Sequence, residues 1–147
     1  MRVLSVVVCL FAFAGCAELK QGLKEASEGV EPNMQAIPQG QGWFCSIASD
    51  MGWHACARTV EDCKADLDNN KKTAMSQGRF DIKFKDCMQA AAAQCFTRNT
   101  MEMQSDGSAK PTPGAECMPD QMSCEHLMED FKKQSKYSRV SKCTSVN

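Results

Sequence analysis

Two short stretches with the same cysteine spacing decide the fold: residues 56–68, which read CARTVEDCKADLD, and residues 117–130, which read CMPDQMSCEHLMED. Six residues separate the two cysteines of each stretch, and the third of the six is Thr59 or Asp120. A Thr or Asp side chain at such a position accepts hydrogen bonds from the first backbone amides of a helix. We therefore predict that a helix begins after each capping residue, with Cys63 and Cys124 one turn inside.

Both predicted helices carry apolar residues at helical spacing, at positions that match between the two. Such a pattern predicts one buried face on each helix, and it places the second cysteine of each stretch on that face. The matched positions are Cys63, Leu67 and Ala74 in the first helix and Cys124, Met128 and Phe131 in the second.

The cysteines around these stretches extend the match into an internal duplication. We predict one unit at residues 43–87 and another at residues 94–143, each with four cysteines. The C-x6-C segment has the same length in both units, whereas the other spacers differ, which is typical of loops in diverged repeats.

A β-hairpin is predicted ahead of each helix. In the first unit, residues 43–47 and 53–57 flank a turn at residues 49–52. In the second, residues 94–97 and 114–117 flank a longer loop, SDGSAKPTPG, whose Gly and Pro residues indicate exposure. The predicted fold is therefore a small, disulfide-rich α+β domain built from two pseudo-repeated hairpin-plus-helix units.

The chain has ten cysteines, and eight of them lie in the two predicted units. Exported chains with an even number of cysteines use them as disulfide frameworks. We favour pairing the first cysteine with the second and the third with the fourth in each unit, and the alternative joins first to third and second to fourth. Each bridge contributes about 2–4 kcal/mol, which offsets an aromatic content of only 7%. The favoured pairs are Cys45–Cys56, Cys63–Cys87, Cys95–Cys117 and Cys124–Cys143.

The first fifteen residues have the layout of a secretory signal peptide, because Arg2 precedes an apolar run at residues 3–14 that ends in small residues. That run is too short to cross a bilayer core of about 30 Å. Two cleavage sites are open, one before Gly15 and one before Cys16. Residues 16–42 hold few large apolar side chains, so we predict a flexible tether ahead of a disulfide-stapled domain at residues 43–147.

The segment at residues 13–16, Phe-Ala-Gly-Cys, resembles the lipobox of bacterial lipoproteins, with Phe13 where that family usually has Leu. The resemblance implies cleavage before Cys16 and acylation of that cysteine, and two or more acyl chains give stable membrane attachment. Ala17, in place of Asp, implies transport to the outer membrane. Cysteine parity agrees: removing Cys9 with the signal peptide and Cys16 with the lipid leaves an even eight.

The cysteine spacing over residues 43–143, with Phe44 beside Cys45 and Phe96 beside Cys95, also resembles that of cysteine-rich putative lipoproteins of myxobacteria-type bacteria. This resemblance rests on spacing and implies no particular activity.

The residue types of common active sites are present without the spacing that their chemistry needs. The chain has no C-x-x-C pair, which argues against zinc sites and thioredoxin-like redox chemistry, and no G-x-S-x-G or phosphate-binding Gly-rich motif. His54 and His126 fall in different units, and we interpret both as structural or surface histidines.

The methionines and aromatic residues allow two further interpretations. Met101, Met103, Met118 and Met122 would form a soft copper(I) site if they met in space, but we expect them to fill the core. Trp43, Phe44 and Trp53 cluster around one predicted hairpin, where we expect them to pack in the core and only secondarily to form a recognition patch.

These observations predict an extracytoplasmic lipoprotein, anchored to the outer membrane through acylated Cys16 and facing the periplasm or the cell surface. The expected role is a non-enzymatic binding or envelope structural module, without a cofactor or bound metal. A net charge of −1 supplies no basic field for nucleic acid. The alternatives are a plainly secreted disulfide-rich protein and a small exported metal-handling protein.

Overall fold

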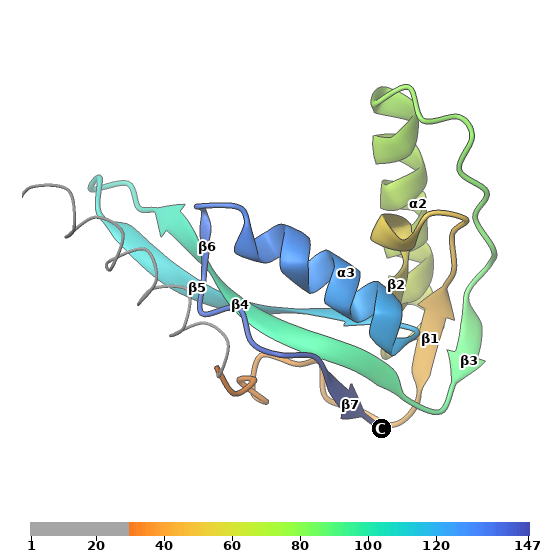
Figure 1. The fold of residues 1–147 in the computed structure, drawn as a ribbon, viewed down its shortest axis with the longest axis horizontal. Helices are drawn as coiled ribbons and strands as arrows, with labels where there is room; N and C mark the ends of the chain where they lie inside the picture. Colours follow the sequence, from red (N-terminus) through yellow and green to blue (C-terminus); the bar gives the residue numbers. More distant parts are fainter. Residues whose placement is uncertain (1–29) are drawn as a thin grey trace, which may run out of the picture.

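The computed structural model describes residues 30–147, which form two antiparallel sheets with a helix packed on each (Figure 1). The fold is α+β and rich in disulfides, as the sequence predicts. The elements are, in order, β1 (Trp43–Ser46), the 3-10 helix η1 (Met51–Trp53), β2 (Ala55–Ala57), α2 (Val60–Ser76), β3 (Met88–Ala90), β4 (Ala93–Met103), β5 (Ala109–Met118), α3 (Gln121–Lys132), β6 (Tyr137–Ser138) and β7 (Thr144–Val146).

The first sheet has the strand order β2-β1-β3, so β1 is its central strand. Cys45 of β1 lies opposite Cys56 on one side and opposite Met88 on the other. In Figure 1, α2 stands upright above this sheet, and the segment after α2 descends beside it to β3.

The second sheet is organised around β4, which pairs with β5 on one edge and with β6 and β7 on the other. Cys95 of β4 lies opposite Cys117 on one side and opposite Thr144 on the other. Helix α3 lies along β4 and β5 (Figure 1), where Met128 packs with Phe96 and Val140.

Four disulfides hold these elements, and they join the pairs that the sequence favours: Cys45–Cys56, Cys63–Cys87, Cys95–Cys117 and Cys124–Cys143. The two hairpin disulfides each join Cα atoms 4.1 Å apart. The disulfides that tie α2 and α3 to the segment after each helix join Cα atoms 6.1 and 6.2 Å apart.

Both helix starts are capped by the residues that the sequence indicates. The Asp62 amide donates to Thr59 Oγ1 (3.0 Å), and the Ser123 amide donates to Asp120 Oδ1 (2.8 Å). The cap places Cys63 and Cys124 at the fourth residue of their helices, where both side chains are fully buried.

Residues 105–111 are exposed, as predicted, but the predicted loop is wrong from Ala109 onward, because β5 begins there and includes Pro111 and Pro113. Proline has no backbone N–H, so a strand tolerates it only where that N–H would point away from the sheet. β5 is an edge strand, and Pro111 and Pro113 lie an even number of residues from Cys117, so the backbone groups of all three point to the same side of the strand. Cys117 belongs to a non-hydrogen-bonded pair with Cys95, and its backbone groups point away from β4. The nitrogens of both prolines therefore face outward, and no ladder hydrogen bond is lost.

The first hairpin also differs from the prediction in its turn. Residues 49–52 do not form a simple turn, because Asp50 caps the 3-10 helix η1 and accepts from the Gly52 amide (3.1 Å). η1 takes up Trp53, so β2 begins only at Ala55.

The predicted boundary between a flexible tether and a domain at residue 43 is wrong for residues 30–42. Ile37 is fully buried and packs with Trp43. Arg58 stacks its guanidinium 3.7 Å from the Trp43 ring centroid and donates to the carbonyls of Pro38 and Gly42. One buried isoleucine, in a segment otherwise poor in large apolar residues, thus docks the segment on the domain.

The two sheets share part of their core. Trp43 of β1 lies in one apolar cluster with Ala93 and with both hairpin disulfides, and its Nε1 donates to the Val146 carbonyl of β7 (2.8 Å). The predicted signal peptide and lipidation site at Cys16 lie outside the described residues. In the described part of the chain, no helix has the length and apolar character needed to cross a membrane.

Ile37→Ala tests whether residues 30–42 belong to the folded domain. Truncating a fully buried isoleucine removes apolar contacts and leaves a cavity, so we expect the free energy of unfolding to fall by about 2–4 kcal/mol. Met34→Ala in the same segment is the control; Met34 is half exposed, and we expect a change within about 0.5 kcal/mol. Guanidinium denaturation measures both, and equal effects of the two substitutions would contradict the docking.

Candidate functional site

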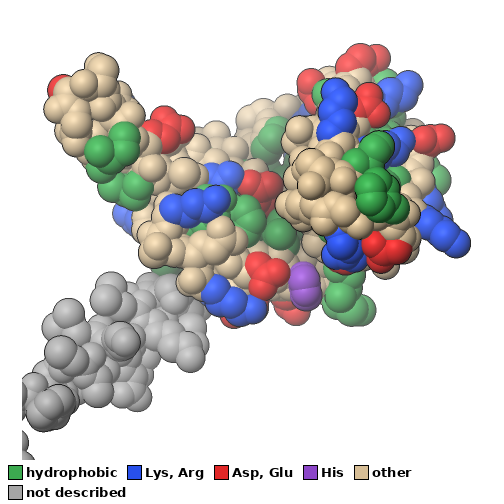
Figure 2. All heavy atoms as spheres, turned by 90° about the horizontal axis from the view of Figure 1, so that it is seen from above, with side chains coloured by type: hydrophobic (Ala, Val, Ile, Leu, Met, Phe, Trp, Pro, Cys, Tyr) green, Lys and Arg blue, Asp and Glu red, His purple; other side chains and the backbone are tan. Residues whose placement is uncertain are grey.

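A groove of about 780 Å³ lies between the two helices and is the candidate functional site. Figure 2 shows the surface hollowed between the part of the molecule that carries α2 and the rest. The two walls and the floor of the groove differ in character. Residues of α2, β2, β5 and α3 line it, among them Asp66, Cys56, Glu116 and Phe131.

One wall is a polar and acidic stripe along α2. Asp62, Asp66 and Asn69 follow one another at spacings of four and three residues, so they lie on the same side of the helix. Cys63, Leu67 and Ala74 form the buried face of this helix. The stripe therefore faces the groove because the neighbouring face is held in the core.

The opposite wall is apolar and comes from α3. Leu127 and Phe131 lie one turn apart on this helix, and both are partly buried against the core below it. The Phe131 ring packs edge-on against Phe96 and stacks on Tyr137, with centroids 5.3 and 4.3 Å away. These contacts hold the Phe131 side chain in place at the groove.

The floor consists of the outer edges of two sheets, since β2 and β5 are edge strands that lie side by side. Cys56 and Cys117 face their disulfide partners at a Cα–Cα distance of 4.1 Å, which is the short spacing of a non-hydrogen-bonded antiparallel pair. In such pairs the backbone N–H and C=O groups point away from the partner strand. No other strand within residues 30–147 pairs with these outer edges.

Glu116 lies in the groove and pairs with Arg98, whose Nη2 donates to Glu116 Oε1 (2.7 Å). Arg98 reaches Glu116 across Gly114, where an added Cβ would come within 2.9 Å of Arg98 Nη1. Burial raises the pKa of the Glu116 carboxyl, although Arg98 acts in the opposite direction, and the charge of Asp66 raises it further.

The Asp66 carboxyl lies on the α2 wall, where its surroundings oppose ionisation. Desolvation in the groove wall, with the Asp62 carboxylate one turn before it, raises the pKa of the Asp66 carboxyl. Within the described chain, no basic side chain forms an ion pair with Asp66. The wall therefore presents an acidic group without an internal counter-charge.

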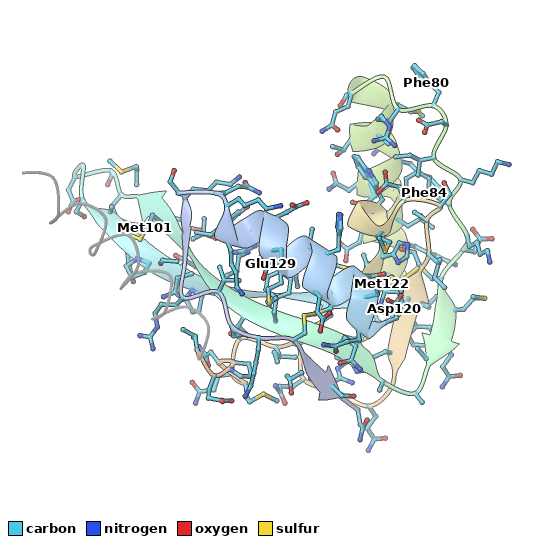
Figure 3. The ribbon with its side chains drawn as sticks, viewed as in Figure 1. Phe80, Phe84, Met101, Asp120, Met122 and Glu129 are labelled. Carbon is cyan, nitrogen blue, oxygen red and sulfur yellow. A yellow bond between two sulfur atoms is a disulfide. The ribbon has the colours of Figure 1, made fainter. Side chains whose placement is uncertain are left out.

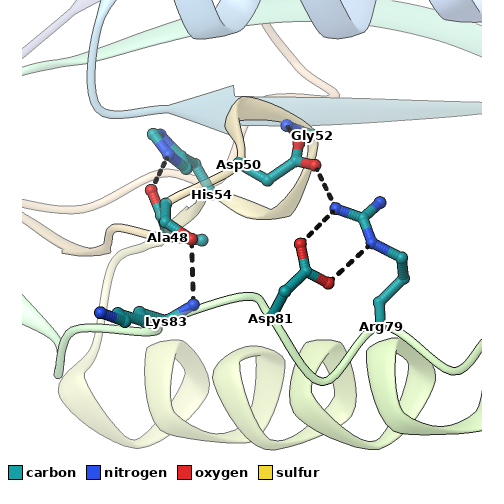
Figure 4. A network of polar contacts seen from close by, with 8 residues as sticks. Ala48, Asp50, Gly52, His54, Arg79, Asp81 and Lys83 are labelled. Carbon is teal, nitrogen blue, oxygen red and sulfur yellow. Dashed lines mark hydrogen bonds and ion pairs between the residues drawn. The ribbon is translucent and has the colours of Figure 1, made fainter.

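His54 joins the two halves of the molecule at one end of the groove. Its Nε2 lies 2.9 Å from the Ala48 carbonyl (Figure 4), and its Nδ1 lies 3.2 Å from Ser123 Oγ in the first turn of α3. The side chain is buried, as a structural histidine would be. Figure 4 also shows Arg79 bridging Asp50 and Asp81 close by, which braces the segment after α2.

The other residues considered from the sequence do not assemble into a site. His126 is exposed on α3. Met101 and Met103 are exposed on the long β4–β5 hairpin, whereas Met118 is buried at the other end of the same ladder. Figure 3 shows Met122 at the start of α3, well away from Met101.

The aromatic residues of the first hairpin are mostly interior. Trp43 is completely buried, and Phe44 is partly buried. Trp53 packs edge-on against Phe84, with ring centroids 6.5 Å apart. Trp43 is therefore a core residue, as expected.

Across residues 30–147, no group of three or more His, Cys, Asp or Glu side chains is placed to hold a metal ion. Comparison with family models, with curated proteins and with solved structures finds no significant match to the chain. The four disulfides indicate an oxidising, extracytoplasmic compartment.

Sequence reasoning did not identify the groove or its carboxylates. A signal for the α2 wall was present, because Asp62, Asp66 and Asn69 repeat at helical spacing beside the apolar face. Glu116 has no such signal, since its place depends on the packing of β5 beside β2.

Asp66→Asn tests the electrostatic character of the α2 wall. A carboxyl whose pKa is raised by folding binds protons more readily in the folded chain, so its ionisation destabilises the fold above that pKa. Replacement by Asn removes this effect, and we expect the melting temperature to rise by about 1–2 °C at about pH 7. At about pH 3, where the carboxyl is largely protonated in both states, the difference should vanish.

Asp68→Asn is the matched control, because Asp68 is exposed on the same helix and lies outside the groove. It carries the same changes in charge and in helix propensity, so a difference between the two variants reports the position of Asp66 in the groove wall. Differential scanning calorimetry of the three chains at both pH values makes the comparison. A loss of stability in Asp66→Asn at about pH 7 would show that the carboxylate supports the fold.

Proposed function

We propose that this chain is an exported lipoprotein, held on the outer membrane by acylated Cys16, whose folded domain is a non-enzymatic binding module. The observation that carries the proposal is which cysteines form disulfides and which do not take part in them. All eight cysteines from Cys45 to Cys143 are consumed in four disulfides, which leaves Cys9 and Cys16 of the ten in the chain. Cys9 belongs to the predicted signal peptide, so Cys16 stands apart at the lipobox-like segment.

We further propose that the domain arose by duplication of one unit. In both halves the first cysteine faces the second across one edge and faces the residue after the fourth cysteine across the other edge. The chain order of central strand, edge strand, capped helix and returning strand is also the same. Matching strand register and cap position in two halves of different loop length favour copying over coincidence.

The groove supports a binding role for the domain. It lies between the two units, where an apolar wall, an acidic wall and two unpaired strand edges meet. The groove combines polar and apolar lining in similar amounts, and its volume of about 780 Å³ is within the range of ligand-binding sites. An anchored domain of this kind would present the groove to partners in the periplasm or at the cell surface.

Cys16→Ser tests the anchor. If Cys16 carries the lipid, the wild-type chain will partition into detergent and show the mass of its acyl chains, because two or more chains bind a membrane stably. We expect the variant to remain in the aqueous phase without acyl mass. Triton X-114 partition and intact mass spectrometry measure the two properties in a Gram-negative expression host.

Cys9→Ser is the control for the loss of any N-terminal cysteine. Because Cys9 would leave with the signal peptide, this variant should be acylated like the wild type. A soluble wild-type chain that begins at Gly15 and carries no lipid would contradict the anchor and would identify plain secretion.

A further inference from the structure

We propose that the groove between α2 and α3 binds an extended peptide segment in which basic and apolar side chains alternate. The proposal rests on the domain being a binding module, and it adds the class of ligand. Three features of the groove carry it: the charge of one wall, the apolar character of the other, and the unpaired strand edges of the floor.

The charge of the groove favours a cationic partner. Asp62 and Asp66 line it and form no ion pair with the described residues, whereas Arg98 balances the charge of Glu116. The one basic side chain in the lining is that of Arg58. Arg58 is already engaged by the ring of Trp43 and by three backbone carbonyls, so it contributes little to free binding capacity. A Lys or Arg side chain of a ligand would supply the counter-charge that Asp66 lacks within the described residues.

The apolar wall sets the second requirement. Leu127 and Phe131 face the groove from α3, and Met118 and Ala115 continue the apolar surface onto the floor. A ligand that carried only charge would leave this surface in contact with water. Burial of apolar area is favourable by about 25 cal/mol per Å², so a ligand with apolar side chains gains affinity here.

The floor distinguishes a peptide from a small cation. Cys56 and Cys117 belong to non-hydrogen-bonded pairs of edge strands, so their backbone N–H and C=O groups point out of the sheets. Because β2 and β5 lie beside each other, a peptide cannot insert between them as an added strand, but the main chain of an extended peptide lying on the groove side can hydrogen-bond to these groups. β5 offers this pairing near Cys117 but not near Pro111 and Pro113, which have no N–H, and this confines a peptide to the end of β5 that borders the groove.

Alternation follows from the two walls. Successive side chains of an extended chain point in opposite directions. A segment that lies along the floor between α2 and α3 therefore sends every second side chain toward each wall. One wall is acidic and the other apolar, so a regular alternation of basic and apolar residues satisfies both at once.

The test compares fluorescein-labelled, end-blocked hexapeptides by fluorescence anisotropy. The first is Lys-Leu-Lys-Leu-Lys-Leu, the second has the same composition in blocks, Lys-Lys-Lys-Leu-Leu-Leu, and the third replaces Lys by Glu. The protein is the full exported chain carrying Cys16→Ser, a form free of lipid whether or not the anchor exists. We expect the alternating basic peptide to bind at least about fivefold more tightly than either of the others.

Variants then place the peptide on the protein. Asp66→Asn should weaken binding of the alternating basic peptide by about threefold to tenfold, and added salt should reduce this difference. Asp68→Asn, on the same helix and outside the groove, should bind as well as the parent. The Asp66→Asn variant is expected to be at least as stable as the parent, so weaker binding would not reflect unfolding.

Four outcomes would overturn the inference. They are equal binding of the Lys and Glu peptides, equal binding of the alternating and blocked peptides, equal effects of Asp66→Asn and Asp68→Asn, and displacement of the peptide by spermidine at the same charge concentration. None of these outcomes bears on the proposed lipid anchor at Cys16, which is tested separately by acyl mass and detergent partition. Absence of binding by all three peptides would also refute the inference, and would leave the anchor standing without its binding role.

Discussion

The two disulfides that flank each helix cap are the constraint on which the rest of the structure depends. Each cap, Thr59 or Asp120, lies three residues after one cysteine of a hairpin disulfide, and four residues before a second cysteine on the buried face of the helix. A hairpin, a helix and a returning strand are thereby tied together within about 50 residues. Disulfides of this kind contribute about 2–4 kcal/mol each, which compensates for cores built largely from alanine, methionine and cystine.

The two stapled units meet through a small number of large side chains. Trp43 inserts into a cluster that includes both hairpin disulfides, Ile37 covers it, and His54 contacts Ser123 at the start of α3. This arrangement brings the edge strands β2 and β5 side by side and sets α2 apart from α3. The groove is a consequence of this packing. It holds a carboxyl group whose pKa is raised by desolvation and by Asp62, and two strand edges that no other strand of residues 30–147 pairs with.

The sequence predicted those parts of the fold that depend on local spacing. Thr59 and Asp120 mark the helix starts because capping acts within one turn. The four disulfides join the favoured pairs, while the alternative that joins first to third and second to fourth cysteine is not the one observed. Features set by distant contacts were missed. Pro111 and Pro113 indicated a loop, but an edge strand with outward-facing nitrogens accommodates them. Ile37 lay in a polar segment, and only the contact with Trp43 explains its burial. The groove needs the relative placement of two sheets, which no local pattern encodes.

The most direct test of the central claim is the disulfide map of the exported, unreduced chain. Cleavage at methionine followed by trypsin separates all eight cysteines, because at least one cut falls between every two consecutive cysteines. From the N-terminal side, these cuts include Met51, Arg58, Lys64, Met88, Arg98, Met118 and Met128. Mass spectrometry should find Cys45 with Cys56, Cys63 with Cys87, Cys95 with Cys117 and Cys124 with Cys143. A bridge between a cysteine of residues 43–87 and one of residues 94–143 would contradict two internally stapled units.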